Sequence, residues 1–234
     1  MIISGQQRLT LIDFPGYIAT TVFTAGCNFR CPFCHNPELV LGGGKILSGV
    51  ADKTEKDFFE FLKKRKGKLE GVCITGGEPT LQPDLVEFIK KIKALGFLVK
   101  LDTNGARPDV LKKLLDLKLL DFVAMDIKNQ LNKYSETVGI KVDTERIKLS
   151  VDLIRNSRVA YEFRTTVVPG LHEAEDFLEI AKWLSGAEAY YLQEYREDVI
   201  LDNNLKKKTK GKKIDLEKIK DQIETNFGKM GIRR

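Results

Sequence analysis

The 234-residue sequence lacks most features that mark secreted, membrane-bound or low-complexity proteins. It has only four cysteines, no apolar run that approaches the ~20 residues of a membrane span, and no basic and long apolar start of the kind that directs secretion. Its 19 glycines and 7 prolines exclude a collagen-like or low-complexity chain. We therefore expect a cytoplasmic globular protein with no membrane attachment and no structural disulfides.

The net positive charge of the chain equals the charge of one lysine-rich segment. The chain has 39 basic and 33 acidic side chains, and its formal net charge is +6. A lysine run at 206–213 supplies that whole excess through Lys206, Lys207, Lys208, Lys210, Lys212 and Lys213. The run is a solvated flexible segment, a docking site for an acidic electron donor, or a nucleic-acid contact. No aromatic residue interleaves it, so nucleic-acid binding is not expected.

Strand-like and helix-like patterns alternate along the chain. Strands are expected at 17–24, 71–75, 97–101, 121–127, 159–168 and 189–195. Helices are expected at 52–66, 83–95, 108–117, 144–156, 173–184 and 214–226. Such alternation predicts a parallel sheet with crossover helices, either an open doubly wound sheet or a barrel.

The chain length bears on the choice between these two architectures. A full eight-unit barrel usually needs about 250 residues, so six units here favour a partial (β/α)6 TIM-like barrel of parallel strands in a single α/β domain. We assign residues 1–200 to the barrel domain and residues 201–234 to the lysine-rich segment and a C-terminal helix. Unusual short motifs follow the expected strands at 26–36, 76–79, 102–105, 126–128 and 169–170. Because ligands of parallel sheets bind at the carboxyl ends of strands, we expect these loops to share one site.

Three of the four cysteines fall in one loop. Cys27, Cys31 and Cys34 lie within eight residues, and thiolates select zinc, copper(I) or iron–sulfur clusters. Structural zinc needs four ligands, and His35 is poorly placed as a fourth because it adjoins Cys34. A four-iron cluster normally takes four thiolates, so three cysteines would leave one iron open to another ligand. Cys73 stands in an apolar strand, where we expect a buried core residue.

The cysteine loop also carries a family resemblance. The stretch Cys27-Asn28-Phe29-Arg30-Cys31-Pro32-Phe33-Cys34 resembles the signature of the radical S-adenosylmethionine (SAM) superfamily. Further motifs of that family are resembled, in the right order, by residues 75–79, 102–105, 126–128 and 167–170, with an arginine at 164. The resemblance spans most of residues 8–196.

The resemblance implies two cofactors and the residues that hold them. These cofactors are a [4Fe-4S] cluster, bound by Cys27, Cys31 and Cys34 with one iron left open, and SAM. The SAM contacts it implies are Phe33, Gly76, Gly77, Glu78, Asp102, Asn104, Asp126, Lys128, Arg164, Pro169 and Gln193. The implied chemistry is reductive cleavage of SAM to a 5′-deoxyadenosyl radical, which abstracts a hydrogen atom.

The subclass rests on shorter segments. Residues 11–16, 23–27 and 34–38 resemble the activating proteins of anaerobic ribonucleoside-triphosphate reductase, and pyruvate formate-lyase activators are similar. Those activators carry a histidine after the last strand, where this chain has Arg196, and this favours the reductase-activating branch. The implied partners are a glycyl-radical enzyme, with anaerobic ribonucleotide reductase favoured, and an electron donor such as flavodoxin or ferredoxin. Alternatives are a pyruvate formate-lyase-type activating enzyme, a radical SAM enzyme acting on a small molecule or deazapurine precursor, and a non-enzymatic thiolate–metal module.

Overall fold

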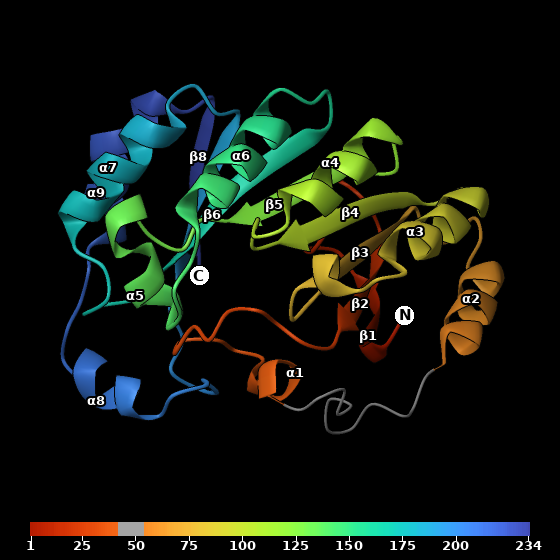
Figure 1. Ribbon diagram of the computed structural model, residues 1–234, viewed down its shortest axis with the longest axis horizontal. Coiled ribbons are helices and arrows are strands. Elements are labelled where there is room, and N and C mark those ends of the chain that lie inside the picture. The colour runs from red at the N-terminus through yellow and green to blue at the C-terminus, as the bar shows by residue number, and fades with distance from the viewer. Residues whose placement is uncertain (42–53) are drawn as a thin grey trace.

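A computed structural model describes residues 1–41 and 54–234 of the chain (Figure 1). One sheet organises these residues, and its strands are ordered as they occur along the chain. The strands are β1 Ile3–Thr10, β2 Ala19–Thr24, β3 Gly71–Gly76, β4 Leu98–Thr103, β5 Phe122–Asp126, β6 Ala160–Val167, β7 Ala189–Glu194 and β8 Lys229–Arg233. β1 pairs antiparallel with β2, and every later pair is parallel. Among the described residues, β1 and β8 each pair with one strand only, so the sheet is a curved, open wall.

Helices connect the strands, and most of them cover the outside of this curved sheet (Figure 1). They are α1 Pro37–Leu41, α2 Glu55–Lys64, α3 Leu85–Ala94, α4 Pro108–Asp116, α5 Tyr134–Val138, α6 Thr144–Arg155, α7 Ala174–Leu184, α8 Asn204–Thr209 and α9 Leu216–Ile223. Short 3-10 turns occupy Pro79–Leu81, Leu131–Lys133 and Glu224–Asn226. Within the described ranges, no helix is long and apolar enough to cross a membrane.

The predicted partial barrel of parallel strands is confirmed. All six predicted strands occur, as β2 to β7, and each predicted helix has a counterpart, although the predicted helix start at Asp52 lies outside the described residues. The sheet is larger than predicted because β1 and β8 extend it at its two edges. The lysine run, for which a flexible segment was one interpretation, contributes most of α8.

The two faces of the sheet differ in polarity. In β4, Val99 and Leu101 belong to the hydrophobic core, whereas Lys100 and Asp102 alternate with them and point to the other face. That other face is the inside of the curved wall. Phe14, which is fully buried, fills the inside near the amino end of β3, where a Cβ on Gly71 would lie 2.7 Å from its ring.

The last strand is tied to the inside of the wall by a paired charge. Arg233 of β8 donates two hydrogen bonds to the buried carboxylate of Glu162 in β6, at 2.7 and 2.6 Å. Its guanidinium also lies 3.9 Å from the ring centroid of Tyr191 in β7, which stands between the two. A bidentate, partly buried pair of this kind is among the stronger charge contacts, so β8 is an integral part of the sheet.

Candidate active site

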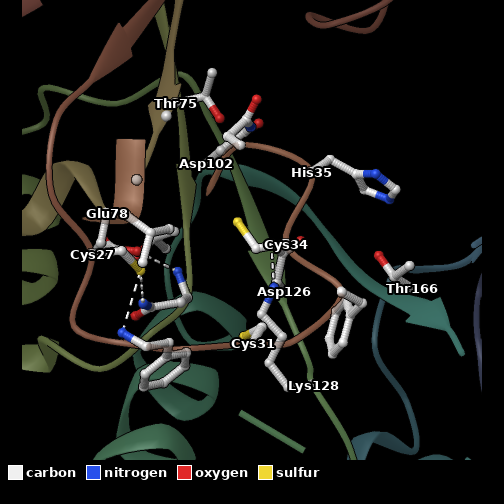
Figure 2. Close-up of a pocket in the computed structure, with 18 of the residues that line it drawn as sticks. Cys27, Cys31, Cys34, His35, Thr75, Glu78, Asp102, Asp126, Lys128 and Thr166 are labelled. Atoms are coloured by element: carbon white, nitrogen blue, oxygen red, sulfur yellow. Dashed lines mark hydrogen bonds and ion pairs between the residues drawn. The ribbon is translucent and has the colours of Figure 1, made fainter. Parts of the chain in front are cut away.

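One cavity of about 190 Å³ opens at the carboxyl ends of the parallel strands. Its walls are the loops and strand ends that follow β2, β3, β4, β5 and β6. Figure 2 shows three cysteines along one loop, with Glu78, Asp102 and Asp126 reaching the same space from neighbouring strands. This is the end of a parallel sheet at which ligands bind.

The cysteine loop is anchored at its start and in its middle by backbone hydrogen bonds. At its start the N–H of Gly26 donates to the carbonyl of Leu39 at 2.7 Å. In its middle the N–H of Arg30 donates to the carbonyl of Val138 in α5 at 2.9 Å. Gly139 follows that carbonyl with φ +72°, and a Cβ there would lie 2.7 Å from the carbonyl oxygen of Arg30. The loop is therefore held against two short helices and not left free over the cavity.

The three thiols suit a multi-iron cluster. Cys27, Cys31 and Cys34 are all free and all line the cavity. Burial raises the pKa of Cys27 to about 11 and that of Cys31 to about 12, although the positive charge of Lys128 favours both thiolates. Among the described residues, no three Cys, His, Asp or Glu side chains converge on a single metal ion. Soft donors that face one cavity without meeting at one point fit a centre whose several irons each take one thiolate.

A glycine-rich loop after β3 packs directly on the cysteine loop. Gly77 allows this contact, because a Cβ there would lie 2.0 Å from the carbonyl oxygen of Gly26. Gly76 is equally constrained, with φ +122° and a Cβ position 2.3 Å from the backbone nitrogen of Thr24. The N–H of Glu78 completes the contact by donating to the Gly26 carbonyl at 2.8 Å. Both glycines are needed so that two backbone segments can meet.

Glu78 joins two loops of the site through its side chain. Its carboxylate is 1% exposed and accepts hydrogen bonds from the N–H and hydroxyl of Thr80, at 3.1 and 2.5 Å. It also accepts from the hydroxyl of Thr103 at 2.8 Å and the N–H of Asn104 at 2.7 Å. Burial raises the pKa of Glu78, and these four donors oppose that rise. The carboxylate thereby fixes the loop after β3 to the loop after β4.

A row of alternating charges runs across β4, β6 and the end of β5 at the cavity. The guanidinium of Arg164 bridges two carboxylates, with Nη2 3.1 Å from Asp102 Oδ2 and Nε 2.5 Å from Asp126 Oδ1. Lys128 Nζ lies 3.0 Å from the other oxygen of Asp126, and Lys100 pairs with Asp102 at the far end. Burial opposes ionisation of Asp126, but Arg164 and Lys128 outweigh it and hold the pKa of its carboxyl well below the usual range. The row offers both signs of charge to a ligand that carries both an ammonium and a carboxylate group.

The structure brings together most of the predicted site residues. Pro169 and Gln193 do not line this cavity; the others do, namely Cys27, Cys31, Phe33, Cys34, Gly76, Gly77, Glu78, Asp102, Asn104, Asp126, Lys128 and Arg164. Pro169 lines a neighbouring cavity with Tyr195 and Lys212. Gln193 lies in β7, in register with Thr166 of β6. Four of the five predicted loops thus share one site, and the loop at 169–170 lies beside it.

Two residues at this wall were missed by the sequence analysis. Thr166 lines the cavity, and its position two residues after Arg164 in the same strand was the available signal. Lys100 is 1% exposed, and its ammonium pairs with Asp102 and lies 3.8 Å from Cys73 Sγ. A lysine inside an apolar strand pattern was the signal for a buried, paired charge.

Comparison with known proteins identifies the class. Residues 21–184 match the model of the radical SAM superfamily, which covers more than half of the chain, so the chain belongs to this family. Enzymes of this family use a [4Fe-4S] cluster and SAM, for which the cysteine loop and the charged row supply suitable donors.

Individual relatives refine this assignment. The chain is 34% identical over 223 residues to a Methanocaldococcus jannaschii protein provisionally named a glycyl-radical enzyme activating enzyme, a match that covers 93% of this chain and 90% of that protein. It is 32% identical over 180 residues to the pyruvate formate-lyase-activating enzyme of Clostridium pasteurianum, covering 74% of this chain and 71% of that enzyme. The protein is therefore a radical SAM enzyme of the activating type.

A solved structure shows the same fold. The crystal structure of Streptococcus suis SuiB superposes with a TM-score of 0.65 at 18% identity and covers 92% of this chain. The match covers 48% of SuiB, so the chain spans about half the length of that protein. At this level of identity the match bears on the fold alone.

Proposed function

We propose that this enzyme generates a glycyl radical on a partner protein, and that the partner is an anaerobic ribonucleotide reductase. The observation that carries the activase role is the match to a relative of that type over nearly the whole length of both chains. The segment after β7 supports the choice of reductase, because Arg196 stands where the formate-lyase activators that the chain resembles carry a histidine. An electron donor such as a flavodoxin or ferredoxin is part of this proposal.

Each group of residues at the site has a separate role in the proposed reaction. When bound, the cluster and SAM supply a 5′-deoxyadenosyl radical that takes a hydrogen atom from the target glycine. The three cysteines would hold the iron centre, and the lack of a fourth thiolate would leave one iron open to the amino and carboxylate groups of SAM. Asp102, Asp126 and Arg164 line the same cavity and would orient the polar groups of bound SAM through charge and hydrogen bonds. The two glycines and Glu78 hold the loop after β3 against the cysteine loop and the loop after β4.

The open sheet supports a protein-sized substrate. The C-terminal helix α9 packs on the outside of the wall, against α7, and therefore does not fill the inside (Figure 1). The inside remains bordered by the edge strands β1 and β8, which do not pair with each other among the described residues. We propose that a glycine-bearing loop of a partner protein enters the cavity between these edges.

A direct test mixes the reduced, reconstituted protein with SAM and a candidate partner under anaerobic conditions. The proposal predicts a glycyl radical doublet in the electron paramagnetic resonance spectrum with anaerobic ribonucleotide reductase, and none with the Cys31→Ser variant. A doublet only with pyruvate formate-lyase would move the enzyme to that branch. SAM cleavage without a radical on either protein would assign it to the small-molecule class, and no SAM cleavage would leave a metal-binding module.

A further inference from the structure

The lysine run is fixed beside the cysteine loop. The segment that leads into α8 touches that loop, where the N–H of Asp202 donates to the carbonyl of Pro32 at 3.0 Å. Pro32 lies between Cys31 and Cys34 in the sequence. Leu205 of α8 is 2% exposed and anchors the helix on the protein. The first lysines of the run therefore project from a helix whose base is hydrogen-bonded to the cysteine loop.

The other end of the run lies over the loop that follows β6. A Cβ on Gly170 would lie 3.2 Å from Lys212 Nζ and 3.4 Å from the carbonyl oxygen of Lys208. Thr209, which is buried, donates its hydroxyl to Glu197 Oε1 at 2.9 Å and so ties the run to the segment after β7. We call the six lysine side chains of this segment, at 206, 207, 208, 210, 212 and 213, the lysine rim.

The lysine rim forms no direct ion pair among the described residues. None of its six ammonium groups forms an ion pair with a carboxylate anywhere in residues 1–41 and 54–234. Lys206 Nζ instead contacts the backbone carbonyl of Asp198 at 3.2 Å, and the carboxylate of Glu197 is engaged by Thr209. Five of the six side chains are exposed, and Lys206 is half-buried. Six positive charges are thus presented together on an anchored segment.

We propose that the lysine rim docks an acidic one-electron donor protein, a ferredoxin or flavodoxin, next to the cysteine loop. This inference rests on the proposed function, because reductive cleavage of SAM needs one electron. One electron leaves the reduced donor and enters the iron–sulfur centre, and no proton or chemical group is transferred. Short-lived complexes of this kind bury little surface and depend on complementary charge, which steers the partners together. The rim supplies that charge on a segment that is hydrogen-bonded to the cysteine loop, which would hold the iron–sulfur centre.

Two matched variants test the docking surface. K206Q/K207Q/K208Q/K210Q neutralises four charges of the lysine rim. K63Q/K64Q/K66Q/K68Q removes the same charge at 63–68, from the last two residues of α2 into the segment before β3, and all four of those side chains are exposed. Because the two variants have the same net charge, they separate a local surface from a general effect of charge. Thermal unfolding of both apo proteins checks that each folds as the wild type does.

The probe is an acidic [2Fe-2S] ferredoxin, and the first readout is its dissociation constant as a function of salt. At low ionic strength we expect the rim variant to bind about 10-fold more weakly or worse, within the 10–10³-fold range of electrostatic steering, and to lose most of the salt dependence. The 63–68 variant should bind as the wild type does. The second readout is stopped-flow reduction by the same ferredoxin, which should slow in the rim variant only, whereas reduction by dithionite should be equal in all three proteins.

Two outcomes would overturn the docking proposal, and a third would bear only on the proposed target protein. Unchanged ferredoxin binding by the rim variant overturns the proposal. So does a rim variant that binds ferredoxin normally but loses affinity for RNA or for the reductase, since the rim would then serve a different partner. Failure to form a glycyl radical on any candidate protein would remove the proposed target, but the ferredoxin affinities would stand as measured.

Discussion

Replacing Glu78 by glutamine should destabilise the protein measurably even without its cofactors. The wild-type carboxylate accepts four hydrogen bonds and donates none. One of its oxygens takes three of these bonds, from Thr80 and Thr103, and the other takes the backbone N–H of Asn104. A glutamine can match only one oxygen. Its NH₂ group must then face at least one donor at hydrogen-bond distance.

The size of the effect follows from that count. Losing one hydrogen bond to a charged acceptor costs about 1.5–3 kcal/mol, and a buried donor left without a partner costs about 1–3 kcal/mol. Glutamine also removes the burial cost of the negative charge, the effect that raises the pKa of Glu78, and this offsets part of the loss. We expect a net loss of about 3 kcal/mol, and for a chain of this size that corresponds to a fall in Tm of roughly 6–12 °C.

The assay is thermal and urea unfolding of the apo protein, with Glu60→Gln as the matched control. Glu60 is an exposed residue of α2, so its substitution should change stability by less than about 0.5 kcal/mol. A Glu78→Gln protein within about 1 kcal/mol of the wild type would refute the reasoning, because it would mean that the four donors do not depend on a carboxylate. The iron content after reconstitution gives a second readout, which should fall if the two loops separate.

Two further predictions concern the same site. Gly77→Ala places a methyl group where the Gly26 carbonyl lies, so the apo protein should lose about 2 kcal/mol, within the range for overpacking, and bind less iron on reconstitution; unchanged values for both would contradict the packing described. Asp126→Asn should destabilise the apo protein at pH 7, because Lys128 loses its carboxylate partner and Arg164 loses one of its two. The lowered pKa of Asp126 gives the wild type stability that is present above about pH 3.9 and lost as the pH falls further, so urea midpoints measured from pH 7 to pH 3 should fall less in the variant.

The sequence predicted the strands that contain long apolar runs, and it did not predict the two strands at the edges of the sheet. Most of the six central strands are largely buried, and their apolar runs are visible in the sequence. Strand β1 has the sequence ISGQQRLT, which is too polar to be predicted as a strand. It forms because its backbone pairs with the free edge of β2. Strand β8 is five residues long and includes Gly231, and it depends on the long-range pair between Arg233 and Glu162. Local patterns do not contain such pairings.

The candidate site was also predicted only in part. Motif spacing predicted which loops converge, because parallel strands deliver their carboxyl ends to one edge. It did not predict that Glu78 is saturated by hydrogen-bond donors from two loops, or that Arg164 bridges two aspartates, since both depend on side-chain geometry across neighbouring strands. Lys100 was overlooked for the same reason, because its ion pair with Asp102 can be inferred only when both side chains are known to face inwards.

The order of the strands has a consequence for how the molecule is assembled. Each strand pairs with the strand that precedes it in the chain, so every pairing closes a short or moderate loop and none waits for a distant segment. The cavity walls run from Cys27 to Thr166 and are complete when β6 has joined the sheet. A folding chain can therefore present all three thiols and the full row of charges while its last 67 residues are still unpaired. Strand β8 then joins β7, and the hydrogen bonds from Arg233 to Glu162 stabilise a sheet whose site is already formed.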